Sequence, residues 1–135
     1  YARMYGLGAA EARISAVLDQ VGLARQRRDL VRTFSRGMQQ RLAIARATLH
    51  QPQVMLFDEP HTGLDQDAAT MLDDVLRSVT AAGRTVMMIT HDLARGLALS
   101  DRVAILRRGK IACEADSSTL TPAAFADQYY GLVHA

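Results

Sequence analysis

The segment V-M-L-F-D-E-P-H-T-G-L-D, residues 54–65, decides the fold of this chain. Its first four residues form an apolar run of strand length, which is typical of a parallel strand buried on both faces. Asp58 and Glu59 follow at the carboxyl end of that strand, where α/β sheets bind their ligands. There Asp58 can hold Mg²⁺, and Glu59, which strand alternation turns the other way, can orient or deprotonate an attacking water. The alternative interpretation is a pair of solvated loop acids.

The residues after this segment predict a strand, helix, strand unit with a right-handed crossover. Asp65 is placed to cap a helix that ends at Gly83, and Thr85 to Thr90 is a second buried strand with His91 just beyond its end. Farther along we expect a short helix, a β-hairpin and a last helix, at residues 93–99, 103–114 and about 121–130. The chain is therefore predicted to be an α/β protein.

Upstream of the strand, the stretch F-S-R-G-M-Q-Q-R, residues 34–41, opens a helix. Ser35 occupies the N-cap position of a helix over residues 36–49, and an earlier amphipathic helix runs from Ala9 to Val21. A capping hydroxyl, a glycine and free backbone N–H groups at a helix N-terminus can bind phosphate. An ordinary N-cap is the alternative interpretation.

Composition limits the function classes open to these 135 residues. Residues 1–50 carry a net charge of +6 and residues 51–135 a net charge of −4, but three Phe and four Tyr offer little base stacking, so we expect no nucleic-acid partner. The single cysteine, Cys113, cannot form an internal disulfide, which fits a reducing compartment. No apolar run is long enough to cross a bilayer.

Taken together, four motifs resemble those of the ABC ATPase family. F-S-R-G-M-Q-Q-R resembles the family signature, V-M-L-F-D-E-P its Walker B strand, T-G-L-D its D-loop, and I-T-H-D its switch histidine. The resemblance implies part of a P-loop NTPase fold, a mostly parallel sheet flanked by helices with a helical subdomain at the N-terminus. It places that subdomain at residues 1–50 and the C-terminal part of the RecA-like core, with a terminal hairpin and helix, at residues 51–135.

The resemblance also implies an ATP-hydrolysing subunit that forms a head-to-tail dimer with a second ATPase subunit, on the cytoplasmic face of the membrane, and drives a permease subunit. Its cofactors would be ATP and Mg²⁺, with Asp58 as the metal ligand through water and with Glu59 and His91 as catalytic residues. Nucleotide contacts are implied for the signature and the D-loop, at Ser35, Arg36, Gly37, Gln39 and Asp65.

Two departures from the family pattern bear on activity. Phe34, Arg36 and Met38 replace the usual Leu, Gly and Gln of the signature, and no G-x-x-x-x-G-K-[ST] phosphate loop occurs in these residues. We therefore expect the chain to lack the Walker A loop through truncation upstream and to be inactive alone. Alternatives are a catalytically degenerate regulatory or interaction module and a non-transport ABC ATPase.

Within the family, the signature and D-loop sequences are most similar to those of exporters, and among these to the haem-exporter ATPases of cytochrome c maturation. Drug, lipid and polysaccharide exporters are the competing interpretation. The transported substrate is chosen by the membrane subunit.

Overall fold

The structure, a computed structural model, describes residues 4, 6, 8 and 10–134. The chain forms two compact units, residues 1–88 and 89–135. The predicted boundary between residues 50 and 51 concerns subdomains of the family and stays a prediction. Among the described helices, none is long and apolar enough to span a bilayer.

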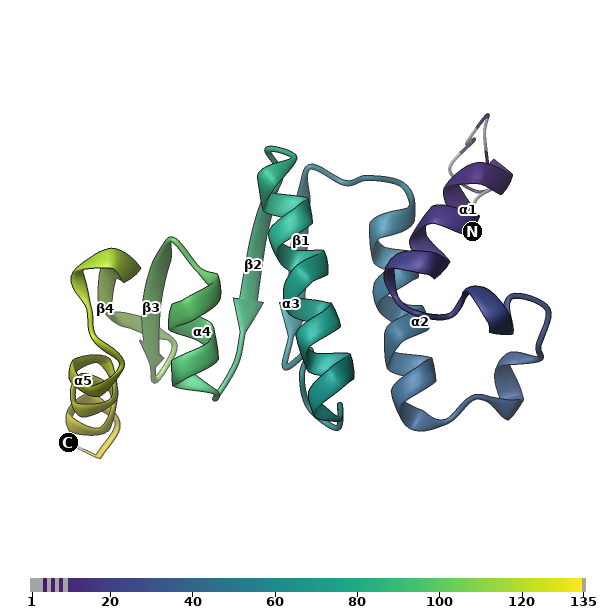
Figure 1. Cartoon of the computed structure of the whole chain (residues 1–135). Coiled ribbons are helices and arrows are strands. Elements are labelled where there is room, and N and C mark those ends of the chain that lie inside the picture. Colours follow the sequence, from purple (N-terminus) through teal and green to yellow (C-terminus); the bar gives the residue numbers. More distant parts are fainter. Residues whose placement is uncertain (1–3, 5, 7, 9, 135) are drawn as a thin grey trace. The chain divides into compact units, whose positions relative to one another are not determined.

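The first unit begins with two packed helices joined by an arginine-rich connection (Figure 1). These are α1 (Ala10–Gln20) and α2 (Arg36–Leu49), with the short 3-10 turns η1 (Ala24–Gln26) and η2 (Val31–Thr33) between them. Both helices lie where their apolar periodicity predicts, although the expected start of the first at Ala9 lies outside the described residues. Ser35 caps α2 as predicted, because its Oγ accepts a hydrogen bond from the Met38 backbone N–H at 3.2 Å.

Arg13 fastens α1 to the C-terminus of α2. Its guanidinium donates to the carbonyl oxygen of Leu49 at 3.1 Å and to that of Thr48 at 2.9 Å. Both carbonyls lie in the last turn of α2, and that of Thr48 also accepts from the Gln51 backbone N–H at 3.1 Å. Burial, and to a smaller extent the charge of Arg84, lowers the pKa of Arg13. A cation at this helix end also meets the negative end of the helix dipole.

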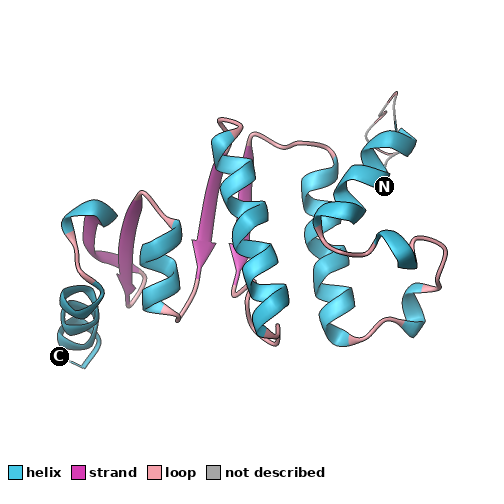
Figure 2. Cartoon of the chain, in the orientation of Figure 1, coloured by secondary structure: helices cyan, strands magenta, loops and turns pink. Residues whose placement is uncertain are grey.

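The rest of this unit is the predicted strand, helix, strand arrangement. It consists of β1 (Val54–Asp58), α3 (Gln66–Ala81) and β2 (Thr85–Ile89), and the two strands lie side by side in one sheet. Both arrows point the same way in Figure 2, so the pair is parallel as expected. Asp65 caps α3, accepting from the Ala68 backbone N–H at 2.8 Å, and the positive φ of Gly83 (75°) turns the chain after the helix.

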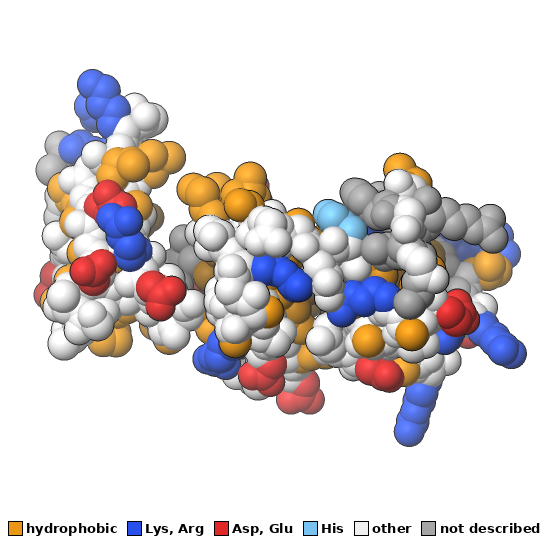
Figure 3. Space-filling view, turned by 90° about the horizontal axis from the view of Figure 1, so that it is seen from above, with side chains coloured by type: hydrophobic (Ala, Val, Ile, Leu, Met, Phe, Trp, Pro, Cys, Tyr) orange, Lys and Arg blue, Asp and Glu red, His pale blue; other side chains and the backbone are white. Residues whose placement is uncertain are grey.

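The prediction that these strands are buried on both faces is wrong for the described residues. Met55 is buried, whereas Val54, Leu56 and Met87 are 59%, 74% and 61% exposed. Alternation along the strands gives one covered face and one open face, because no described element packs on the second face. We call the open face, defined by Val54, Leu56 and Met87, the bare sheet face. Figure 3 shows hydrophobic side chains reaching the surface.

The second unit contains α4 (Leu93–Leu99), an antiparallel hairpin of β3 (Arg102–Arg107) and β4 (Lys110–Asp116), the 3-10 turn η3 (Ser117–Thr119) and α5 (Pro122–His134). The hairpin turns at Arg108 and Gly109, which both have positive φ, as a tight turn of this type requires. Leu97, Ile105 and Phe125 form the core of this unit. The last helix extends beyond the predicted end near residue 130, because its apolar positions continue packing there.

Candidate functional site

The carboxyl end of β1 carries the predicted metal ligand and catalytic base. Asp58 is the last residue of the strand and is exposed, and by strand alternation it shares the bare sheet face with Val54 and Leu56. One exposed carboxylate at a strand end suits an ion held mainly through water and phosphate, so the residue fits Mg²⁺. Among the described residues, no group of three or more His, Cys, Asp or Glu could hold a metal ion by itself.

Glu59 does not continue the strand, so the prediction that strand alternation orients it is wrong. Its φ of 46° is in the left-handed region, which costs a residue with a side chain about 1–2 kcal/mol. The chain needs this conformation because it turns sharply here: the Thr62 backbone N–H donates to the Glu59 carbonyl oxygen at 3.1 Å. The Glu59 side chain is half-buried, unlike that of Asp58.

Asp65 ends the same turn. Its carboxylate is the N-cap acceptor of α3, and the residue before it is held by a hydrogen bond from the Leu64 N–H to the His61 carbonyl oxygen at 3.1 Å. Between them Gly63 has a φ of 79°, a conformation that suits glycine. The segment from Glu59 to Asp65, which we call the D-loop turn, is therefore a sequence of local hydrogen bonds with two left-handed residues.

The N-terminus of α2 presents the residues predicted to bind phosphate. Ser35 is exposed, and its hydroxyl can still donate while it accepts from Met38. A Cβ added to Gly37 would meet no heavy atom within 4 Å, so an anion can approach the backbone there. The Gln39 side-chain amide, by contrast, donates to the carbonyl oxygen of Phe34 at 3.2 Å. That bond steadies the helix start and occupies one of the amide's donors.

Two contacts join the N-terminal turn of α2 to the D-loop turn within this unit. The Arg36 guanidinium lies against Gly63, with its Nε 3.5 Å from the place that a Cβ would occupy. One helical turn farther, the Gln40 side-chain amide donates to the Pro60 carbonyl oxygen at 2.9 Å. Arg36 and Gln40 lie on one face of α2. The structure thus brings two of the predicted motifs together.

His91, the predicted switch histidine, lies in the connection between β2 and α4 and is exposed. It belongs to the second unit, and its approach to Asp58 and Glu59 stays a prediction. The next residue is fixed, because Asp92 caps α4 by accepting from the Arg95 N–H at 3.0 Å.

Sequence reasoning missed a buried pair beside this site. His61 Nε2 lies 2.7 Å from Asp73 Oδ1, and the two side chains are 8% and 14% exposed. A signal for it existed in the helix pattern, since Asp73 follows Ala69 by four residues and so falls on the buried side of α3. Only the fold places His61 opposite it.

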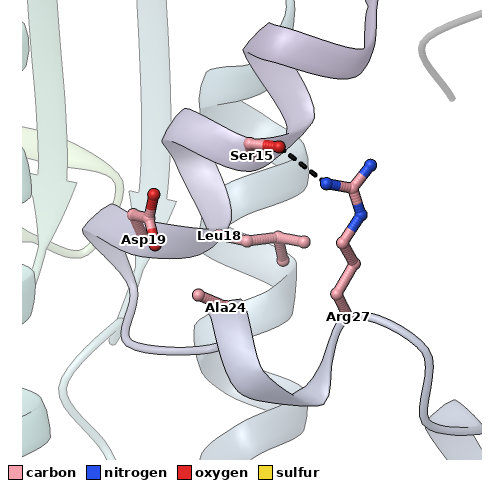
Figure 4. A pocket seen from close by; sticks show the side chains of 5 residues that line it. All are labelled: Ser15, Leu18, Asp19, Ala24 and Arg27. Carbon is pink, nitrogen blue, oxygen red and sulfur yellow. Dashed lines mark hydrogen bonds between the residues drawn. The ribbon is translucent and has the colours of Figure 1, made fainter.

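A pocket of 180 Å³ lies apart from these residues, between α1 and η1 (Figure 4). Two of its polar lining residues contact each other, because Arg27 donates to Ser15 Oγ at 2.7 Å, and Arg27 also pairs with Glu11. None of the predicted site residues lines it.

Known proteins resemble the chain in sequence and in fold. The profile of the family described as ABC transporter matches residues 3–62. The octopine permease ATP-binding protein P of Rhizobium radiobacter is 41% identical over 105 residues, which are 78% of this chain and 40% of that protein. A fluoroquinolones export ATP-binding protein of Mycobacterium tuberculosis is 41% identical over 95 residues, 70% of this chain and 32% of that protein.

Two solved structures share the fold. CbiO1 from Clostridium perfringens, part of the ABC transporter complex cbiONQ, superimposes with a TM-score of 0.69 at 24% identity, covering 87% of this chain and 46% of that one. An ATP-binding cassette of an ABC transporter in its ADP conformation gives 0.70 at 20% identity, covering 87% and 45%. The chain thus spans less than half the length of these relatives.

Proposed function

We propose that the chain belongs to the family of ABC transporter ATP-binding domains and contributes the signature and the catalytic carboxylates to an ATP-hydrolysing transporter subunit. The observation that carries the proposal is the end of β1, where an exposed Asp58 precedes a Glu59 held in a left-handed turn. A strained residue beside a candidate metal ligand is typical of functional sites.

The residues divide the work by their chemistry. Mg²⁺, held by Asp58 through water, would neutralise phosphate charge. Glu59 accepts the proton of the attacking water, and His91 contacts the γ-phosphate.

The open start of α2 binds the γ-phosphate of a nucleotide carried by a second subunit. Ser35 Oγ–H and the N–H groups near Gly37 donate to its oxygens, with Arg36 and Gln39 beside them, and Asp65 reaches across the interface. This arrangement needs a head-to-tail dimer, in which each nucleotide is completed by the partner's signature. It also accounts for a site on open surface, since one chain supplies only half of it.

In the whole protein we place the subunit on the cytoplasmic face of the membrane, bound to a permease, with a phosphate loop contributed outside these 135 residues. The chain alone would then not hydrolyse ATP. Haem export is the narrower proposal, supported by the resemblance of residues 34–41 and 58–65 to that subfamily. The relatives above are named for other compounds, octopine and fluoroquinolones. Identifying the membrane subunit that co-purifies with the full-length protein tests the proposal of haem export.

Glu59→Gln in the full-length subunit with its permease tests the proposal. We expect phosphate release to fall by about a hundredfold or more, because a missing general base typically costs that much, while ATP binding persists and the dimer accumulates in size-exclusion chromatography. Asp67→Asn is the matched control, since Asp67 is an exposed carboxylate on the first turn of α3 outside the proposed site. Undiminished hydrolysis in Glu59→Gln would contradict the proposal, whereas a parent subunit that binds ATP without hydrolysing it would favour a degenerate module.

A further inference from the structure

The pair of His61 and Asp73 is a buried hydrogen bond between the D-loop turn and α3. The 2.7 Å contact is almost fully buried, and a carboxylate can only accept, so His61 Nε2 carries the hydrogen and donates it to Asp73. His61 Nδ1 is buried too and has no hydrogen-bond partner among the described residues.

This hydrogen bond attaches the middle of the D-loop turn to α3. His61 lies two residues after Glu59, and Asp73 lies two turns inside α3, the helix that Asp65 caps. The Gln40 amide holds the preceding carbonyl, that of Pro60. Of these anchors, only the His61 side chain connects the turn to the body of α3.

The need for such an anchor follows from the backbone. Glu59 has a φ of 46°, and a residue with a side chain keeps this conformation only when its surroundings fix it. A buried polar pair is weak evidence for stability, because apolar residues of similar size can often replace even a buried charged pair without loss. A buried pair at this place is better explained by the geometry that it sets.

We infer that His61 and Asp73 are positioning residues that fix Glu59 in the orientation needed to accept a proton from water. The inference rests on the proposed function. Neither residue touches the nucleotide. Loss of the pair therefore lowers the rate of the chemical step and leaves ATP binding almost unchanged.

The test uses the full-length subunit with its permease and compares Asp73→Ala, Asp73→Asn and the control Asp74→Ala. Asp74 is next to Asp73 on α3 but exposed, in a surface pair with Arg77 at 3.4 Å. We expect Asp73→Ala to lower kcat at least about tenfold, since small misplacements of catalytic groups have effects of this size, with KM for ATP changed less than about twofold. Asp73→Asn keeps an oxygen that accepts from His61 and should restore most of kcat. Asp74→Ala should resemble the parent.

His61→Gln and His61→Ala repeat the comparison from the other side, and they keep the test informative if Asp73→Ala does not fold. Glutamine can donate to Asp73 and should be the milder change. The double variant His61→Ala, Asp73→Ala should be no slower than the worse single variant. A lowered melting temperature with unchanged kcat, or equal losses in Asp73→Asn and Asp73→Ala, would overturn the inference.

Glu59→Gln separates the two possible failures. If Glu59→Gln still hydrolyses ATP, the proposed function is wrong. If Glu59→Gln is inactive and Asp73→Ala keeps its kcat, only the positioning role is wrong.

Discussion

Replacing Gly37 with alanine should move stability and ATP hydrolysis in opposite directions. Gly37 is the second residue of α2, and a Cβ there would meet no heavy atom within 4 Å. Alanine is favoured over glycine in helices because glycine loses more backbone entropy, so the free energy of unfolding should rise by about 0.5–1 kcal/mol. Nothing in the fold of the first unit opposes the new methyl group.

The same methyl group would stand where the proposed phosphate approaches the backbone. A hydrogen bond to a charged group contributes about 1.5–3 kcal/mol, and losing one such contact in the transition state lowers the rate by about tenfold to a hundredfold. Steady-state phosphate release at saturating ATP measures the rate, and urea unfolding of the same preparation measures stability. We expect a protein that is slightly more stable and much slower.

Gly83→Ala is the matched control. Its Cβ would also meet nothing within 4 Å, but its φ of 75° makes alanine cost about 1–2 kcal/mol. This variant should lose stability and keep its rate. If Gly37→Ala hydrolyses ATP at the parental rate, the N-terminus of α2 does not contact phosphate. If Gly37→Ala lowers the free energy of unfolding, the conclusion that the space around Gly37 is open is wrong.

Two further changes test the anchors of the first unit. Arg13→Met keeps an unbranched apolar stem but removes both hydrogen bonds to the carbonyl oxygens of Thr48 and Leu49. Urea unfolding should show a loss of about 2–3 kcal/mol, and a loss below about 0.5 kcal/mol would exclude this role. Asp65→Ala removes the cap on the Ala68 N–H and should cost about 1 kcal/mol. Asp65→Asn keeps the cap, so it should unfold like the parent while hydrolysis falls if the charge reaches across the dimer interface; equal hydrolysis would argue against that contact.

The sequence predicted the elements that depend on local interactions. Ser35 and Asp65 start their helices because each side chain bonds a backbone N–H three residues ahead, which spacing alone reveals. The fold class followed from the same regularity, since an apolar strand, a capped helix and a second apolar strand leave few topologies.

What the sequence could not predict depends on contacts between distant residues. The left-handed turn at Glu59 has no glycine to announce it, and the contact of Arg36 with Gly63 joins motifs nearly thirty residues apart. The pairing of His61 with Asp73 requires the packed helix. The open face of the strands was also missed. An apolar run predicts that both faces of a strand are buried, but it does not show whether residues of this chain cover both faces.

The bare sheet face has a consequence for the cation as well as for the fold. Val54, Leu56 and Asp58 project from β1 on that one side, so a layer that covers the two hydrophobic side chains must reach the edge of the carboxylate. Excluding water there lowers the local dielectric constant and strengthens the attraction between Asp58 and a nearby cation. Under the proposed function, any layer that covers this face would therefore strengthen the binding of Mg²⁺ near Asp58 without adding a ligand.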